Sequence, residues 1–301
     1  MGLSPPEVNV TRWWSKQPPV DGYWGPSTSS IDWCEANYAI TRFIAEFANT
    51  LSNLAFFAWA FYGVKKCRDE KLPLPLALCQ VGIALVGIGS FMFHATLHYE
   101  WQLADELPMI FSSAFTTYVV FDTGRASLPR SRFVRSLPFL LFLYCSGFTA
   151  IYLRHPNPVF LQVAFAAIQL TANFRAAYTI CTAPVKTCKE QKNKAQIIRY
   201  LSAGFFTTLI GFLIWNVDNI FCDRISHLKQ HLGIPWSFAV EGHAWWHLAT
   251  GTGAYLSTVG LQLMSVSFKE GADGFEIKRG GILALCPYVA RTLTNMHSKL
   301  D

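Results

Sequence analysis

Residues 74–98 read LPLALCQVGIALVGIGSFMFHATLH and decide the fold class of this chain. No Asp, Glu, Lys or Arg interrupts the run, and it is longer than the roughly 20 residues that a helix needs to cross the hydrocarbon core of a bilayer. Irregular backbone cannot face lipid, because its N–H and C=O groups would find no hydrogen-bond partner there. The stretch therefore predicts a membrane-spanning helix with a histidine, His94, near its far end.

The composition of the whole chain also indicates an integral membrane protein. Of its 301 residues, 51% are hydrophobic and only 15% are charged, whereas soluble domains carry roughly 25% charged residues. The mean hydropathy is +0.25. The formal net charge is +6, but the Lys and Arg residues lie in short connections between apolar runs, where membrane proteins place their cytoplasmic anchors. We therefore predict no nucleic-acid partner.

Seven stretches in all are long and apolar enough to span a membrane. We predict that each is a helix, which makes the fold class an all-α integral membrane bundle of seven transmembrane helices. The predicted spans are 43–64, 74–98, 103–122, 137–153, 158–181, 198–217 and 239–264.

The positive charges between the spans predict the orientation of the bundle. Lys and Arg are concentrated after the first, third, fifth and seventh spans, and cytoplasmic loops carry such an excess. The chain is thus predicted to consist of a lumenal N-terminal segment, 1–42, a transmembrane domain, 43–264, and a cytosolic C-terminal tail, 265–301.

Two features lie outside the predicted spans. A sequon at Asn9 fits a lumenal segment. An apolar patch at 281–290 is too short to span and is expected to rest on the surface or pack loosely.

Three histidines and an aspartate fall at the lumenal ends of three predicted spans. His243 and His247 are one helical turn apart, so both rings lie on one helix face. His94 lies near the end of the second span and Asp105 near the start of the third. Both His94 and His243 lie roughly 6 Å from the end of their span, so the side chains can meet in one layer. His98, one turn after His94, is an alternative third ligand.

Three neutral imidazoles around an open fourth position form a catalytic zinc site, so the group predicts a metal-dependent hydrolase. For His243 and His247 alone, hydrogen bonding inside the bundle is the alternative. Ser90 lies one turn before His94, where it would stabilise an oxyanion or bond to its own helix backbone. Asp105 would transfer protons, orient a histidine or cap its helix.

A second group of polar residues precedes and begins the first span, and its members with oxygen-bearing side chains are Asp32, Glu35, Asn37 and Glu46. Calcium takes about 6 to 8 oxygen ligands, which makes this group a candidate calcium site, and a solvated acidic cap before a helix is the alternative. Cys34 lies in the same segment. Of the eight cysteines, only Cys34 and Cys222 map to the lumenal side, where thiols can oxidise.

Three blocks of the sequence resemble the alkaline ceramidases, and the similarity extends over residues 23–264. The resemblance implies a seven-helix intramembrane zinc amidase that cleaves the N-acyl bond of ceramides, including phytoceramide or dihydroceramide, to a sphingoid base and a free fatty acid. It also implies a location in the endoplasmic reticulum or Golgi, a ceramide substrate from the bilayer, contacts with membrane lipids and no obligate protein partner. The blocks are GYWGPSTSSIDWCEANYAITRFIAEFANTLSN at 22–53, GSFMFHATLHYEWQLADELPM at 89–109 and EGHAWWHLATGTGAYL at 241–256.

Carried over residue by residue, the resemblance gives each motif a role. Ser90 is similar to the serine that stabilises the oxyanion, and Asp105 to the acid that handles protons. Cys34 and Cys222 match the family's disulfide. Ala36 departs from an acidic residue that we expect among family members, which puts a charge at that position in doubt. The implied zinc ligands are His94, His243 and His247. The implied calcium ligands are Asp32, Trp33 through its carbonyl, Glu35, Asn37 and Glu46.

The main alternative is a heptahelical lipid receptor or sensor with a structural zinc. A structural zinc site has a fourth protein ligand, whereas a catalytic one keeps an open position. Apart from Cys34 and Cys222, no cysteine maps to the lumenal side as a fourth ligand, which favours hydrolysis. A lipid or ion transporter is a weaker alternative, because the sequence shows no inverted repeat.

Overall fold

The computed structural model describes residues 21–124, 130–281 and 285–292, so the sequon at Asn9 lies outside the described residues. The described chain is mostly helical and ends in two short strands. Its α-helices are α1 (Phe47–Ser52), α2 (Leu54–Asp69), α3 (Leu74–Thr96), α4 (Tyr99–Phe121), α5 (Arg132–Arg154), α6 (Pro158–Thr182), α7 (Cys188–Ile220), α8 (Cys222–Leu232) and α9 (Gly242–Lys269). The remaining elements are the 3-10 helices η1 (Trp236–Val240) and η2 (Ala272–Gly274) and the strands β1 (Phe275–Gly280) and β2 (Cys286–Arg291).

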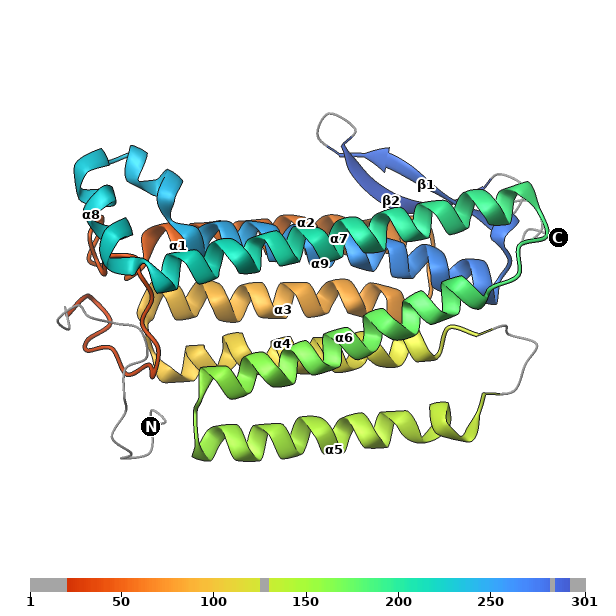
Figure 1. Cartoon of the computed structure of the whole chain (residues 1–301), viewed down its shortest axis with the longest axis horizontal. Coiled ribbons are helices and arrows are strands. Elements are labelled where there is room, and N and C mark those ends of the chain that lie inside the picture. The colour runs from red at the N-terminus through yellow and green to blue at the C-terminus, as the bar shows by residue number, and fades with distance from the viewer. Residues whose placement is uncertain (1–20, 125–129, 282–284, 293–301) are drawn as a thin grey trace.

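The long helices run side by side along the longest axis of the molecule (Figure 1). Helix α3 packs against both α2 and α4, and α7 packs along most of α9. Helix α5 lies at the edge of the bundle, where it packs mainly against α4. The short helices α1 and α8 lie at one end, and this end also carries the start of α9.

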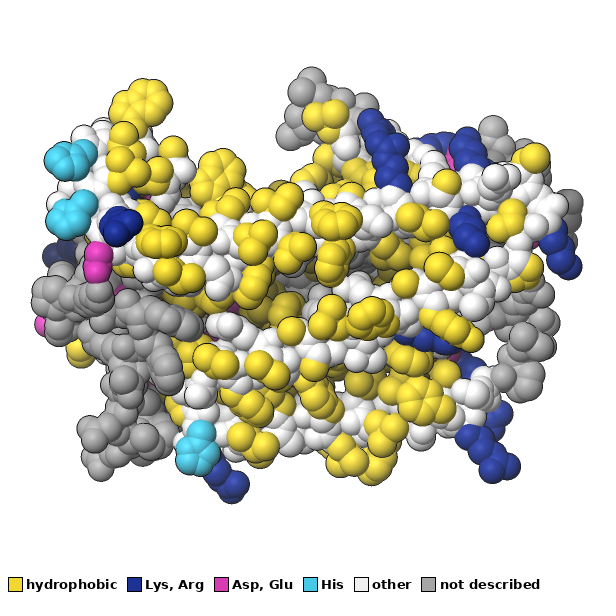
Figure 2. Space-filling view, viewed as in Figure 1, with side chains coloured by type: hydrophobic (Ala, Val, Ile, Leu, Met, Phe, Trp, Pro, Cys, Tyr) yellow, Lys and Arg dark blue, Asp and Glu magenta, His cyan; other side chains and the backbone are white. Residues whose placement is uncertain are grey.

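Four helices are long and apolar enough to cross a membrane, namely α3, α5, α6 and α7. Hydrophobic side chains cover the visible flank of the bundle, and most of the visible Lys and Arg side chains lie at the end away from α8 (Figure 2). These four candidate spans support a membrane protein. The other predicted spans, 43–64, 103–122 and 239–264, overlap α1 with α2, α4, and α9 respectively.

The C-terminal hairpin departs from the prediction of an all-α fold. Strands β1 and β2 pair antiparallel, with Phe275 opposite Arg291 and Ile277 opposite Val289. Phe275 and Val289 are buried in the same core as Tyr255 of α9, whose hydroxyl donates to the Pro287 carbonyl. The described part of the apolar patch at 281–290 is thus not loosely packed, because strand pairing satisfies its backbone and frees one face to pack on the helices.

The turn between α3 and α4 aligns two helices that carry predicted site residues. Leu97 adopts a positive φ of 52° and ends α3, and α4 begins two residues later at Tyr99. Gly89 then permits a close approach, because a Cβ atom there would collide with the carbonyl oxygen of Ala104 on α4. The two helices are therefore in close contact beside Ser90 and Asp105.

Candidate metal centre and active site

The three histidines predicted from the sequence meet inside the bundle. His94 comes from α3, and His243 and His247 come from the first two turns of α9. One ligand atom from each ring lies within 4.8 Å of the others. All three side chains are buried, with at most 4% of their surface exposed. The arrangement can hold a metal ion.

Two of the buried ring nitrogens have no protein partner. The Nδ1 atom of His94 contacts the Glu46 carboxylate, whereas its Nε2 atom is buried without a hydrogen bond. Nδ1 of His243 is likewise buried and without a partner. A buried polar atom that lacks a partner is costly, so these orphaned nitrogens fit the coordination of a divalent cation.

His247 is oriented by the end of α1. The hydroxyl of Ser52 donates to the Asn49 carbonyl at 2.8 Å, so its oxygen is left to accept from Nδ1 of His247, also at 2.8 Å. The Asn49 carbonyl is a second acceptor, 3.1 Å from the same nitrogen. Both acceptors place the ring proton on Nδ1, which leaves the lone pair of Nε2 for a metal.

Ser90 and Asp105 lie next to the histidine group. The Ser90 hydroxyl is 3.4 Å from Nε2 of His247, the nitrogen that the Ser52 contact leaves unprotonated. It also hydrogen-bonds the Asp105 carboxyl group. The Ser90 hydroxyl and the Asp105 carboxyl group therefore lie together, next to a ring nitrogen that is free to bind a metal.

His98, the alternative third ligand, lies outside the group. Its Nε2 atom is 3.0 Å from the Trp24 carbonyl, and it precedes α4 as the N-cap residue. The left-handed conformation of Leu97 breaks the helix between His94 and His98, so the two rings no longer share a helix face. Sequence spacing alone had left both rings as candidates.

The acidic segment before α1 is folded against the histidines. The ring of Trp33 packs on that of His243, with 4.4 Å between centroids. The backbone N–H of Trp33 donates to Glu46 at 3.2 Å, and the other oxygen of Glu46 contacts His94. Glu46 therefore links the acidic segment directly to the histidine group.

The carboxylate side chains of this segment are buried. Asp32, Glu35 and Glu46 are all buried, and Asn37 donates from Nδ2 to an Asp32 oxygen at 3.1 Å. The Oδ1 atom of Asn37 is buried without a partner. Both oxygens of Glu35 accept from backbone N–H groups at the start of α1. Glu35 therefore also caps α1, as the alternative to a calcium site predicts.

The charges of this segment repel each other. Burial raises the pKa of Glu35 to about 8, and the nearby carboxylates of Glu241 and Glu46 add to this shift. A cation among these oxygens would remove the repulsion and favour the ionised form. The donor set, which consists of carboxylate and amide oxygens, is the kind that calcium prefers.

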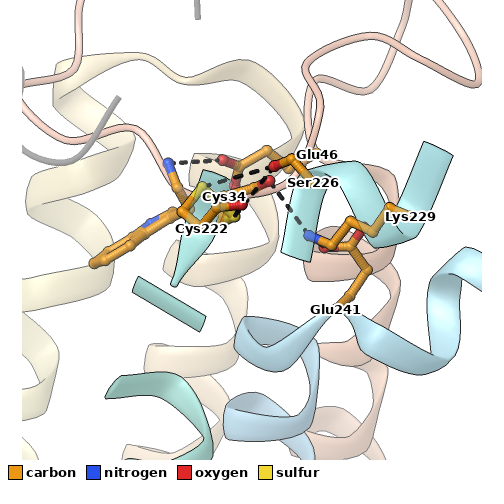
Figure 3. Close-up of a disulfide and its surroundings, with 7 residues drawn as sticks. Cys34, Glu46, Cys222, Ser226, Lys229 and Glu241 are labelled. Carbon is orange, nitrogen blue, oxygen red and sulfur yellow. Dashed lines mark hydrogen bonds and ion pairs between the residues drawn. A yellow bond between two sulfur atoms is a disulfide. The ribbon is translucent and has the colours of Figure 1, made fainter. Parts of the chain in front are cut away.

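A disulfide and a hydrogen bond join α8 to the acidic segment, and an ion pair joins α8 to the start of α9 (Figure 3). Cys34 and Cys222 form a disulfide, with 5.5 Å between their Cα atoms, as expected from the resemblance. The ammonium of Lys229 lies 2.6 Å from a Glu241 oxygen and donates to the Cys34 carbonyl at 3.3 Å. The sequence did not predict Lys229 or Glu241 as site residues, because nothing in their spacing places them beside Cys34.

Comparison with known proteins assigns the chain to a family. A family model described as Ceramidase matches residues 25–290. The chain is 38% identical to Alkaline ceramidase 3 of Mus musculus over 245 residues, which are 79% of this chain and 85% of that protein. It is 30% identical to Alkaline ceramidase YPC1 of Saccharomyces cerevisiae over 268 residues, or 86% of this chain and 84% of that protein. The chain therefore belongs to the alkaline ceramidase family.

Proposed function

We propose that this protein is an alkaline ceramidase that uses zinc to hydrolyse the N-acyl amide bond of ceramides inside the membrane. The observation that carries the proposal is the buried group of His94, His243 and His247, with Ser90 and Asp105 at its open side. The names of the relatives support the reaction. The products would be a sphingoid base and a free fatty acid.

The three histidines would hold the zinc ion. Their donor set is typical of catalytic zinc, which lowers the pKa of water and polarises a carbonyl group. Glu46 and Ser52 would hold two of the rings in the tautomer that presents Nε2. Among the residues that the structure describes, no fourth His, Cys, Asp or Glu joins this group, which supports catalysis over a structural zinc in a receptor.

Ser90 and Asp105 would carry the proton and charge transfers. The Ser90 hydroxyl is placed to donate a hydrogen bond to the oxyanion that forms when the amide carbonyl is attacked. Asp105 is placed to accept a proton from the attacking water and to return it to the departing amine. Their mutual hydrogen bond would keep both side chains oriented before the substrate arrives.

The acidic segment would bind calcium through Asp32, the Trp33 carbonyl, Glu35, Asn37 and Glu46. Support comes from the burial of the three carboxylates and from the unpartnered Oδ1 atom of Asn37. The ion would act indirectly. It would fix Glu46, and Glu46 in turn would fix the ring of His94.

We further propose seven transmembrane spans, with a lumenal N-terminus and a cytosolic C-terminus, in the endoplasmic reticulum or Golgi. The segments 1–42, 43–264 and 265–301 would then be lumenal, transmembrane and cytosolic. The disulfide at the α8 end supports a lumenal location of that end, and the Lys and Arg side chains at the other end support a cytosolic one. Ceramide would enter from the bilayer.

The decisive experiment combines metal analysis with product identification. Purified protein would be analysed for bound zinc and calcium and then given ceramide, dihydroceramide and phytoceramide, with the released base and fatty acid identified by mass spectrometry. We expect about one zinc per chain and hydrolysis of at least one substrate. His94→Ala is expected to lose both zinc and hydrolysis. A variant that keeps full activity without zinc, or a zinc-loaded wild type that releases no fatty acid, would refute the proposal.

A further inference from the structure

A large apolar groove runs between α4 and α5, on the side of α4 away from the histidines. Its volume is about 910 Å³, within the range of about 300–1,000 Å³ that is usual for small-molecule sites. Aromatic and aliphatic side chains line it, including Phe115 and Phe142. Ala114, which also lines it, follows Asp105 by nine residues, which are about two and a half helical turns, so the two residues lie on opposite sides of α4. The groove therefore faces away from the active site.

The shape of the groove suits an aliphatic chain. It extends along α5 from Pro138 to Leu153, a length of about 22 Å at 1.5 Å per residue. This is more than half of the roughly 30 Å hydrocarbon core. Helix α5 is itself long and apolar enough to span a membrane, so the groove lies at the depth of lipid tails.

Two arginines mark the end of the groove that is remote from the histidines. Arg132 and Arg135 begin α5, and both are exposed. Arg135 precedes Pro138 by three residues and Phe142 by seven, so it lies on the groove face of the helix. Neither arginine makes an ion pair with a described residue, whereas the neighbouring Arg130 pairs with Asp122. Two free guanidinium groups at the mouth of an apolar groove suit an anionic head with an apolar tail.

We propose that the groove binds a glycerophospholipid, with one acyl chain between α4 and α5 and its phosphate against Arg135 and Arg132. Basic pockets at the water-facing ends of membrane helices bind phospholipid head groups in this way. Ceramide is not the expected occupant, because it carries no phosphate and its amide must reach the histidines on the opposite side of α4. The bound lipid would fill the gap between the edge helix α5 and the rest of the bundle.

The test is native mass spectrometry of the purified full-length protein titrated with phosphatidylglycerol. Ala150→Phe would fill the groove, and Arg135→Gln would remove the charge at its mouth. Ala166→Phe places the same side chain on the exposed face of α6, and Arg154→Gln removes a charge from the other end of α5, so these two are the matched controls.

We expect the wild type and both controls to bind one phosphatidylglycerol. Ala150→Phe should lose this binding, and Arg135→Gln should weaken it about fivefold, with melting temperatures showing that both variants are folded. Equal binding by wild type and Ala150→Phe would overturn the proposal. Displacement of the lipid by ceramide, or a raised KM for ceramide in Ala150→Phe, would assign the groove to the substrate and also overturn it. Because the phosphatidylglycerol titration is measured without hydrolysis, its result does not depend on the proposed reaction, and only the KM comparison does.

Discussion

The carboxylate of Glu46 contacts Nδ1 of His94, so one side chain belongs to both the acidic segment and the histidine group. Glu46 is the N-cap residue of α1 and accepts from the Trp33 backbone with its other oxygen. From the sequence, its replacement is expected to affect calcium alone. The contact with His94 changes that expectation, because a carboxylate that orients a ligand histidine contributes to metal affinity.

Replacing Glu46 should therefore weaken both metal sites. We expect Glu46→Gln to lower zinc affinity by about 10 to 100-fold and to raise the calcium concentration needed for half-maximal activity. Asp32→Asn is the matched control, since Asp32 accepts a hydrogen bond from Asn37 and, within the described residues, makes no hydrogen bond with a histidine. It should change the calcium titration and, at saturating calcium, leave the zinc content alone. Normal zinc retention in Glu46→Gln, measured against a competing chelator, would contradict the coupling.

Ser52 should be required for tight zinc binding although it does not reach the metal. Removing its hydroxyl takes away one acceptor that fixes the tautomer of His247. Ser52→Ala is expected to lower zinc affinity by about tenfold, the smaller end of the range for such contacts, because the Asn49 carbonyl remains. Ser136→Ala removes a hydroxyl that bonds only its own helix backbone on α5 and should bind zinc like the wild type. Equal affinities in the two variants would rule out the role of Ser52.

The residues of the site divide into those that the sequence predicts and those that only the fold reveals. Ser90, His94, His243 and His247 lie on helices, where the spacing of 3.6 residues per turn fixes which side chains share a face. The end of a span also fixes their depth. Ser52 reaches His247 only because α1 packs beside α9, and no periodicity within one segment encodes that approach.

The C-terminal hairpin is a second feature that the sequence alone does not predict. Its strands are six residues each, and periodicity does not separate such short apolar runs from buried or surface segments. Their conformation is decided by contacts with distant helices. The Arg291 guanidinium, for example, donates to the carbonyls of Glu70 and Lys71 after α2.

Gly89 should be intolerant of even a methyl group. A Cβ atom there would collide with the Ala104 carbonyl of α4, and overpacking of this kind costs about 1–3 kcal/mol. Gly147 on α5 is the control, because a Cβ atom there meets nothing within 4 Å. We expect Gly89→Ala to lower the melting temperature in detergent and Gly147→Ala to leave it equal or raised. A melting temperature of Gly89→Ala at the wild-type value would show that α3 and α4 are not in close contact.

The disulfide should stabilise the α8 end of the molecule. Cys34 and Cys222 are 188 residues apart in sequence, and losing a native disulfide typically costs about 2–5 kcal/mol. Cys34→Ser should therefore melt at a lower temperature than the wild type, and a reducing agent should lower the wild type to the same value. Cys181→Ser replaces an exposed free cysteine and should have no effect. A wild type that melts identically with and without reductant would argue against a stabilising bridge.

Ser90 and Asp105 should affect the reaction and not the metal. Both lie beside the histidines, but Asp105 bonds Ser90 and is not part of the group of possible metal ligands. We expect Asp105→Asn to lower kcat by about 10²–10⁴-fold, as for loss of a general acid or base, and Ser90→Ala to lower it by about 10²–10³-fold, as for loss of one oxyanion donor. Zinc content should stay at the wild-type value in both. If Asp105→Asn instead loses zinc in proportion to activity, Asp105 holds the metal site together and a separate proton carrier has to be sought. The double variant distinguishes the two cases further, because residues that act as one unit give a combined loss smaller than the product of the single losses.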